Sequence, residues 1–212
     1  MPRPVVFDLD GVLIDSEPLY ERAMRAYAAE LGRDDDADLY AVTLGRREAD
    51  FVPDLAERLA LPIEQVGAEL ERVTLPLIEE LAPMPFAAEV VSALRSDGRS
   101  LAVATSSTAP FAHAALHRIG VDGLIDALVT GDEVERGKPD PEIYLLAAER
   151  LGVGAAGCVA IEDTPAGVAA AQAAGMICLA IPHALSPADG LGEADAIVDD
   201  LSGALAELRR PA

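Results

Sequence analysis

Basic residues, cysteines and long apolar runs are all scarce in this sequence. Its 212 residues contain 16 Lys and Arg against 37 Asp and Glu, which gives a formal net charge of −21. A protein with this charge is repelled by nucleic-acid phosphates and by anionic lipid headgroups, and no cluster of basic residues reverses the repulsion locally. We therefore expect neither nucleic acid nor a membrane surface among its partners.

The sequence has no stretch of about 18 apolar residues, the minimum for a membrane-spanning helix. The chain enters a short apolar run at Val5 without the longer run of a signal peptide. The two cysteines, Cys158 and Cys178, each lie in an apolar run, which is more typical of buried thiols in a reducing compartment than of a disulfide or a metal site. We expect a soluble, cytoplasmic protein that is a monomer or a weak homodimer.

Short apolar runs are present instead, and they predict buried strands. They cover residues 4–7, 101–104, 127–129, 158–161, 177–181 and 196–198. Their apolar residues are continuous rather than alternating, which indicates burial on both faces, and segments of helical length separate the later runs. Pro141 and Pro165 each follow a capping residue at a predicted helix start, and Gly152 and Gly175 end those helices. The pattern predicts an α/β fold with a Rossmann-like parallel sheet.

Residues 16–85 separate the first predicted strand from the second and contain no convincing strand. Apolar residues recur at helical spacing in part of this segment, namely Val66, Leu70, Val73 and Leu77. Pro76 is expected to kink or divide that helix. A segment of about 70 residues is far longer than an ordinary connection, which has a handful of residues.

We therefore predict that the segment is an inserted helical cap domain formed by residues 16–85. The α/β core would consist of residues 1–15 and 86–212. The cap either only covers the sheet or forms a lid over a site at the carboxyl ends of the strands, where sheets of this kind bind ligands.

Asp8 and Asp10 follow the first predicted strand directly. Residues two apart in an extended chain point the same way, and Gly11 allows the chain to turn sharply behind them. Two close carboxylates are unfavourable unless a cation lies between them or one of them holds a proton. A solvated strand end is the alternative, but the apolar residues on both sides favour a functional pair.

Three further groups of polar residues end other predicted strands or lie just beyond them. Glu162 and Asp163 could supply carboxylates to a hard cation such as Mg²⁺. Thr105 and Ser106 form a strand-to-helix turn suited to an anion, and Lys138 lies in a rigid stretch where it could offset phosphate charge. Each group alone could be a helix cap or a surface side chain. Together they meet at one edge of the predicted sheet.

Three other sequence patterns are similar to known functional motifs but lack a feature that each motif requires, so we predict no site from them. Residues 152–157 have the GxGxxG spacing of a dinucleotide site but precede a strand instead of following one. His113 and His117 have zinc-compatible spacing, but Ala114 stands where a metalloprotease has glutamate. Ser106 and its neighbour lack the GxSxG setting of a serine hydrolase.

At these positions the sequence resembles the haloacid dehalogenase-like superfamily of aspartate-based phosphoryl-transfer enzymes. Residues 8–16, DLDGVLIDS, are similar to its first motif, and Thr105-Ser106 to its second. Lys138-Pro139 is similar to the third motif and Glu162-Asp163 to the fourth, in the family's order and over essentially the whole chain. The helical insert resembles the cap of the subgroup that contains phosphoglycolate phosphatase, sugar-phosphate phosphatases and β-phosphoglucomutase.

The resemblance implies a role for each motif residue. Asp8 would attack phosphorus to form an aspartyl phosphate, and Asp10 would protonate the leaving oxygen and later activate water. Thr105 and the Ser106 amide would hold the phosphate, and Lys138 would neutralise charge.

The resemblance also implies Mg²⁺ as the cofactor. Its ligands would be Asp8, the carbonyl oxygen of Asp10 and Asp163, while Glu162 would be either a further ligand or a neighbour of the ligands.

The cap departs from the mutases of that subgroup. They usually have a histidine shortly after the first motif, where this chain has Tyr20, and a Gly-x-Ser-Arg stretch, where residues 44–48 read LGRRE. Arg46 and Arg47 are candidate substrate contacts, because guanidinium groups suit anionic or hydroxyl-rich ligands; the alternative is an exposed helix start. Phe86 replaces the glycine of a common Met-Pro-Gly sequence at the end of the cap.

These features predict a Mg²⁺-dependent phosphatase for a small phosphorylated metabolite, a sugar phosphate or a phosphoglycolate-like monoester, acting through an aspartyl phosphate. A β-phosphoglucomutase-like isomerase is the alternative. A receiver-like signalling domain also surrounds a phosphorylated aspartate with acids, a hydroxyl and a lysine, but the nucleophile on the first strand and the long insert argue against it. A dehalogenase is the least favoured alternative, because it would need no metal cluster and this chain has Asp10, Glu162 and Asp163.

Overall fold

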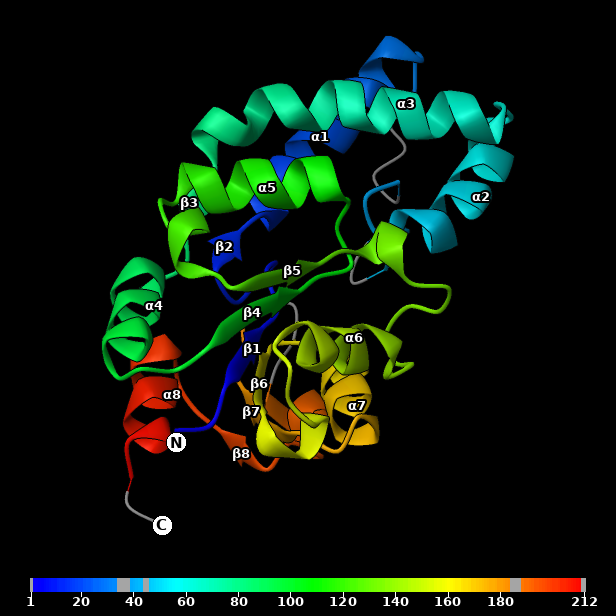
Figure 1. The fold of residues 1–212 in the computed structure, drawn as a ribbon. Helices are drawn as coiled ribbons and strands as arrows, with labels where there is room; N and C mark the ends of the chain where they lie inside the picture. Colours follow the sequence, from blue (N-terminus) through cyan, green and yellow to red (C-terminus); the bar gives the residue numbers. More distant parts are fainter. Residues whose placement is uncertain (1, 34–38, 44–45, 184–187, 211–212) are drawn as a thin grey trace.

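The computed structural model describes residues 2–33, 39–43, 46–183 and 188–210 (Figure 1). Its centre is a six-stranded parallel sheet with the strand order β5-β4-β1-β6-β7-β8. The strands are β1 (Val5–Phe7), β4 (Leu101–Ala104), β5 (Ala127–Val129), β6 (Val159–Glu162), β7 (Ile177–Ala180) and β8 (Ala196–Ile197). Each lies in or overlaps one of the six predicted runs, so the predicted α/β fold with a Rossmann-like parallel sheet is confirmed.

Helices cover both faces of the sheet. They are α4 (Ala87–Ser96), α5 (Ala109–Arg118), α6 (Glu142–Arg150), α7 (Pro165–Ala173) and α8 (Leu201–Leu208). Short 3-10 helices complete this part of the chain: η2 (Asp122–Leu124), η3 (Gly131–Glu133), η4 (Ala155–Gly157) and η5 (Ala188–Leu191). Val5 and Phe7 of β1 pack with α4, α5 and α8, whereas Val6 packs with α6 and α7. Successive side chains of a strand point to opposite faces, so the continuous apolar runs reflect burial on both sides.

The segment between β1 and β4 is mainly helical and has its own apolar core (Figure 1). It contains α1 (Glu17–Glu30), α2 (Glu48–Leu59), α3 (Ile63–Thr74) and the 3-10 helix η1 (Leu75–Glu80). The α-helical conformation of α3 ends at Thr74, just before Pro76, as predicted. None of the helices in the described ranges is both long and apolar enough to cross a membrane.

One expectation for this segment was wrong, because it contains a strand. β3 (Ala82–Pro83) pairs antiparallel with β2 (Ile14–Asp15), so the two points where the chain passes between the helical insert and the sheet lie side by side. Each strand has only two residues, too few to produce a periodic pattern in the sequence. The division into a core of 1–15 and 86–212 and a cap of 16–85 stays a prediction.

Arg47, at the start of α2, connects the insert to the sheet domain. Its guanidinium pairs with both oxygens of Asp50 at 2.7 Å, and its side chain is only 7% exposed. It also donates to the carbonyl oxygens of Gly131, Val134 and Glu135 at 3.4, 2.8 and 3.2 Å. This side chain therefore supplies the hydrogen-bond donors for several carbonyl groups beside η3.

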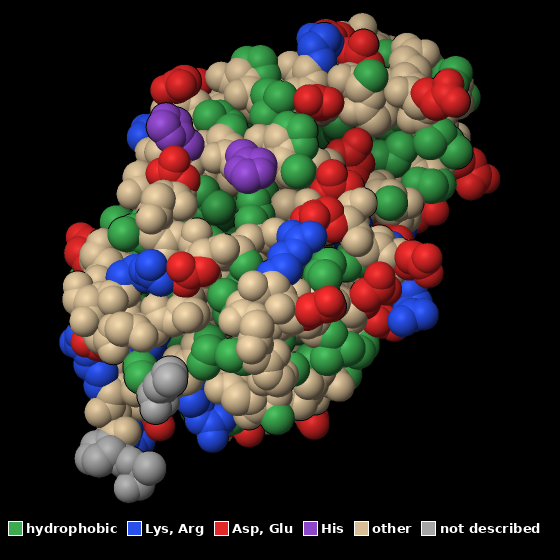
Figure 2. Space-filling model, viewed as in Figure 1, with side chains coloured by type: hydrophobic (Ala, Val, Ile, Leu, Met, Phe, Trp, Pro, Cys, Tyr) green, Lys and Arg blue, Asp and Glu red, His purple; other side chains and the backbone are tan. Residues whose placement is uncertain are grey.

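The surface reflects the excess of acids. Figure 2 shows many Asp and Glu side chains and few Lys and Arg on the visible face, with carboxylates gathered between the insert, at the top, and the sheet domain below. Because these acidic groups repel one another, the positions of the basic residues show where the repulsion is offset.

We expect Arg47→Ala to lower the free energy of unfolding by about 1–3 kcal/mol, because buried carbonyl groups lose their donors. Denaturant unfolding measures this change. Arg46→Ala is the matched control: its ion pair with Asp54 is exposed, with 39% and 58% of the two side chains accessible, so we expect a change within about 0.5 kcal/mol. Equal losses for the two variants would contradict the role assigned to Arg47.

Candidate active site

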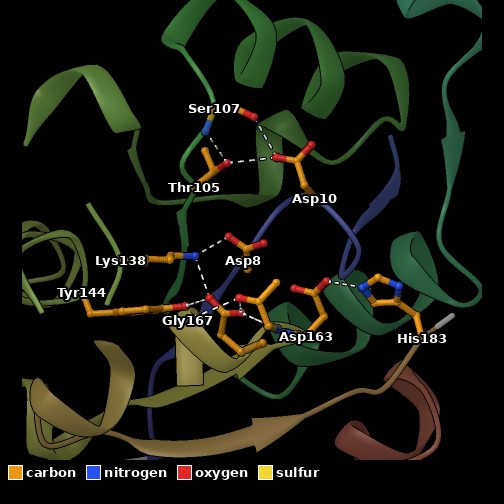
Figure 3. A network of polar contacts seen from close by, with 11 residues as sticks. Asp8, Asp10, Thr105, Ser107, Lys138, Tyr144, Asp163, Gly167 and His183 are labelled. Atoms are coloured by element: carbon orange, nitrogen blue, oxygen red, sulfur yellow. Dashed lines mark hydrogen bonds and ion pairs between the residues drawn. The ribbon is translucent and has the colours of Figure 1, made fainter. Parts of the chain in front are cut away.

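The predicted site residues of the sheet domain meet at the carboxyl edge of the sheet (Figure 3). Asp8 follows β1, Thr105 follows β4, and Glu162 and Asp163 lie at the end of β6. Lys138 reaches the same place from the connection between η3 and α6. Parallel strands bring their carboxyl ends to one edge, which is why residues distant in the sequence converge here.

Gly11 allows the loop after β1 to approach β6 closely. Its φ is +79°, a conformation that side chains rarely adopt, and a Cβ atom there would lie 2.1 Å from Oδ2 of Asp163. Glycine is the residue that meets both requirements at once.

Lys138 forms the centre of the site. Its Nζ donates to Oδ1 of Asp8 at 2.5 Å and to Oε1 of Glu162 at 2.6 Å. The three side chains are at most 9% exposed. The ammonium also lies 5.2 Å from the ring centroid of Tyr144, whose hydroxyl donates to Oε1 of Glu162 at 2.7 Å. One cation is therefore shared by two buried carboxylates.

The two carboxylates respond differently to this environment. Burial raises the pKa of Asp8 well above its ordinary value, with Lys138 opposing the shift and other carboxylates adding to it. Burial also acts to raise the pKa of Glu162, but Lys138 and the donors around this residue outweigh it, so that the pKa lies below its ordinary value. The pKa of Lys138 is lowered by burial and raised more strongly by its two acidic partners. Glu162 is thus the stable counter-ion, and Asp8 is the carboxylate whose charge is less fully compensated.

Glu162 is saturated with hydrogen bonds. Its Oε2 accepts from the backbone N–H of Asp163 at 3.0 Å and from both the N–H and the hydroxyl of Thr164 at 3.2 Å. Gly167 packs against the same carboxylate, since a Cβ atom there would lie 1.8 Å from Oε1. Both oxygens of Glu162 are therefore already bound by protein groups.

Asp163 presents the opposite case. Its Oδ2 lies 2.7 Å from Nε2 of His183, while its Oδ1 is buried without a hydrogen-bond partner among the residues that the structure describes. Burial raises the pKa of Asp163 to about 6, although the hydrogen bond to His183 opposes the shift. A buried carboxylate oxygen without a partner is unfavourable unless another group binds it.

These residues fit a divalent cation. Oxygen atoms of Asp8, Glu162 and Asp163 lie within 4.8 Å of one another. Lys138 pairs with two of these three buried carboxylates, and Oδ1 of the third, Asp163, has no donor among the described residues. Hard cations prefer such oxygen ligands. Because the oxygens of Glu162 are occupied, Asp8 and Asp163 are the residues better placed to bind a metal.

Asp10 lies apart from this cluster. Its carboxylate points toward the turn after β4 (Figure 3) and accepts from the hydroxyl of Ser107 at 2.7 Å and from that of Thr105 at 3.2 Å. On the other oxygen it accepts from the hydroxyl of Ser16 at 2.6 Å. Three hydroxyl groups thus fix the orientation of Asp10 beside Asp8.

A cavity of about 760 Å³ lies above these residues, between the sheet edge and the helical insert. Six of the predicted site residues line it: Asp8, Asp10, Arg46, Ser106, Lys138 and Asp163. Thr105 and Glu162 are fully buried behind the lining. The structure does not bring Arg47 to the cavity, because its guanidinium binds Asp50 and backbone carbonyls. Residues 44–45 of the cap stretch lie outside the described residues.

Sequence reasoning missed several of the residues that hold the site. Tyr144 lies on the apolar face of α6 and was indistinguishable from a core residue. His183 follows β7, and applying the strand-end criterion to this fifth strand would have identified it. Ser16 and Ser107 contact Asp10 from two different segments, a relationship that only the fold reveals.

We expect Gly167→Ala to lower the free energy of unfolding by about 1–3 kcal/mol or more, because the new methyl group overlaps the fixed carboxylate of Glu162. Gly154→Ala is the matched control, since it has φ −75° and nothing within 4 Å of the added Cβ. It should be neutral or slightly stabilising. Urea unfolding compares the two, and a Gly167→Ala variant as stable as Gly154→Ala would show that Glu162 is not held in place.

Comparison with known proteins agrees with this geometry. A family model described as haloacid dehalogenase-like hydrolase matches residues 3–175. The phosphorylated carbohydrates phosphatase of Thermotoga maritima is 38% identical over 200 residues, which cover 91% of both chains. Hexitol phosphatase A of Escherichia coli is 33% identical over 198 residues, with 92% of this chain and 90% of the relative covered.

Solved structures have the same fold. CbbY from Rhodobacter sphaeroides, in complex with phosphate, superposes with a TM-score of 0.83 and 26% identity, over 95% of this chain and 96% of that one. A protein described as a putative β-phosphoglucomutase from Thermotoga maritima superposes with a TM-score of 0.80 and 35% identity, over 98% of both chains. The chain therefore belongs to the haloacid dehalogenase-like hydrolases, which confirms the enzyme class that its four motifs predicted.

Proposed function

We propose that this enzyme is a Mg²⁺-dependent phosphatase that hydrolyses a small phosphorylated metabolite through an aspartyl phosphate on Asp8. The observation that carries the proposal is the position of Asp8, at the floor of the cavity, 2.5 Å from Lys138 and beside Asp10. Two relatives are named as a phosphorylated carbohydrates phosphatase and a hexitol phosphatase, and these names support a sugar phosphate or similar monoester as the substrate.

The first half of the reaction transfers the phosphoryl group to the protein. A carboxylate oxygen of Asp8 forms a bond to phosphorus while the bond from phosphorus to the substrate oxygen breaks. Asp10, in its protonated form, gives its proton to that oxygen, and the alcohol leaves. Proton transfer of this kind contributes typically about 10²–10⁴-fold to the rate.

The second half returns Asp8 to its original state. Asp10, now a carboxylate, accepts a proton from water as the water oxygen bonds to phosphorus, and the bond between phosphorus and Asp8 breaks. Ser16, Thr105 and Ser107 keep Asp10 oriented through both steps. Lys138 offsets negative charge on Asp8 and on the phosphoryl group, and Glu162 and Tyr144 hold the ammonium in place.

Mg²⁺ bound by Asp8 and Asp163 would supply positive charge next to the phosphate oxygens. Lys138 alone faces several carboxylates and leaves little net charge for a dianion. Two residues act around the ligands: Glu162 orients Lys138, and His183 orients Asp163 through Oδ2.

We expect Asp8→Asn to abolish phosphate release from a panel of phosphomonoesters, and Asp10→Asn to lower it by at least about 10²-fold. Asp122→Asn, which changes an exposed carboxylate paired with His117, should leave turnover unchanged. Phosphate release and circular dichroism of each variant measure activity and folding. The panel includes β-glucose 1-phosphate with a bisphosphate primer, because formation of the 6-phosphate there would favour the isomerase. No release from any ester by the folded wild type would refute the proposal.

We expect Mg²⁺ to raise the thermal unfolding temperature of the wild type, because ligands that bind only the folded state stabilise it, by about 2.7 kcal/mol at 100 times the dissociation constant. Asp163→Asn should remove the response to Mg²⁺. Glu162→Gln should retain it, since that carboxylate is occupied by protein donors. Thermal unfolding of both variants, measured with chelator and with Mg²⁺, tests these two predictions. An unchanged response to Mg²⁺ in Asp163→Asn would contradict the assignment of Asp8 and Asp163 as the metal ligands.

A further inference from the structure

The cavity has two regions of different character. Its floor contains the sheet-edge residues and Lys138, whereas its opposite wall comes from the helical insert and from η3. The charged residues that line the cavity from the insert and from η3 are Glu17, Arg46, Glu48, Glu71 and Asp132. Of these, Glu17 lies 3.7 Å from Nδ1 of His183, which lines the cavity from the sheet side. Acids therefore outnumber basic groups in the region where the part of the substrate beyond the phosphate would lie. Figure 2 shows carboxylates gathered between the insert and the sheet domain.

Among the residues that the structure describes, Arg46 is the one basic residue of this wall, and its guanidinium already has partners within the insert. Nη2 of Arg46 pairs with Asp54 at 2.8 Å and also donates to the carbonyl oxygen of Asp50. Its Nη1 donates to the carbonyl oxygen of Val42 at 3.3 Å. The charge of Arg46 is therefore largely offset within the insert.

Glu48 is partly buried, as is Glu17, whereas Glu71 and Asp132 are exposed. Glu48 is the first residue of α2, and its carboxylate lies against α3 at Gly67, where an added Cβ atom would be 3.2 Å from Oε1. Burial raises the pKa of Glu48, and repulsion from Glu71 and Asp132 raises it further. The start of α2 would otherwise attract a phosphate group, but Glu48 and Asp50 occupy its first turn.

Uncharged hydroxyl groups also line the cavity, among them those of Tyr20, Tyr40, Thr43, Thr74, Ser107 and Thr108. Apolar side chains, including Met24, Phe51 and Phe111, form other parts of the lining. Hydroxyl groups both donate and accept hydrogen bonds, and a carboxylate accepts them, so together they suit the hydroxyl groups of a sugar or polyol. A second phosphate or a carboxylate in the substrate would instead face like charges in a partly desolvated space.

We infer that the cavity selects phosphomonoesters whose remaining body is uncharged and rich in hydroxyl groups, and that Glu48 is the residue that excludes a second anionic group. The inference rests on the proposed phosphatase activity and narrows its substrate class. It disfavours phosphoglycolate-like esters, whose carboxylate would face this wall, and also bisphosphates.

Two nearly isosteric esters test this selectivity. Sorbitol 6-phosphate and 6-phosphogluconate differ at the far carbon, which is a hydroxymethyl group in one and a carboxylate in the other. We expect the wild type to prefer sorbitol 6-phosphate by at least about 10-fold in kcat/KM, because a fixed carboxylate repels the added charge. Glu48→Gln keeps the shape of the side chain and removes its charge, and it should narrow the preference by at least about 3-fold, mainly by lowering KM for 6-phosphogluconate.

Glu57→Gln is the matched control, because Glu57 is exposed on the same helix and does not line the cavity. Its preference should equal that of the wild type. Glu71→Gln should change the preference in the same direction as Glu48→Gln. An unchanged preference in Glu48→Gln, or a wild type that hydrolyses both esters equally well, would overturn the inference.

Equilibrium binding separates this inference from the proposed function. Asp8→Asn, which is expected not to turn over, can be titrated calorimetrically with each ester in the presence of Mg²⁺, alone and combined with Glu48→Gln. Tighter binding of sorbitol 6-phosphate that depends on Glu48, without phosphate release by the wild type, would support the selectivity and refute the phosphatase. Phosphate release by the wild type without discrimination between the two esters would support the phosphatase and refute the selectivity.

Discussion

The ammonium group of Lys138 lies between the carboxylates of Asp8 and Glu162, and most of the site is arranged around this shared contact. Glu162 can keep its charge in the protein interior because Tyr144, Thr164 and backbone N–H groups donate to it, and Gly167 leaves room for it. The fixed Glu162 holds Lys138, and Lys138 in turn holds Asp8. The site therefore depends on a negative charge that never touches the substrate, since a lysine without this counter-ion would lose its position and part of its stabilisation.

The helical insert is connected to the sheet domain by three different kinds of contact. The chain enters and leaves it through β2 and β3, which pair with each other, so both covalent connections lie at one place. Arg47 adds a polar contact that depends on space at Gly131 and Gly137, because a Cβ atom at Gly137 would lie 2.3 Å from Nε of Arg47. Apolar residues of α1 and η1 also pack against α5 in the core of the sheet domain. A local connection, a buried arginine and this apolar contact together bring a wall of the cavity over the sheet edge.

Sequence reasoning located the sheet, and it placed most of the candidate site residues at one edge of it, because both follow from simple rules. Continuous apolar runs identify buried strands, and parallel strands collect the residues that follow them at one edge. It did not find β2 and β3, since two-residue strands leave no periodic pattern. Nor did it find Tyr144, whose apolar ring belongs to the core while its hydroxyl belongs to the site. It interpreted Arg47 as a substrate contact because the residue type alone cannot show which acceptors surround a guanidinium. Such assignments depend on contacts between distant segments, which only the folded chain supplies.

The excess of acidic residues has opposite consequences at the two ends of the cavity. At the floor, buried carboxylates exceed the charge of Lys138 and leave Oδ1 of Asp163 without a donor, an arrangement that an added cation would stabilise. A cation bound there would turn an acidic cluster into a site for a phosphate dianion. At the opposite wall, Glu48 and its acidic neighbours lie beside hydroxyl groups, with Arg46 already paired. A ligand suited to both ends carries its whole negative charge on one phosphate. The net charge of −21 thus repels polyanions from the surface, and the proposed selectivity extends the same repulsion to a second anionic group within the cavity.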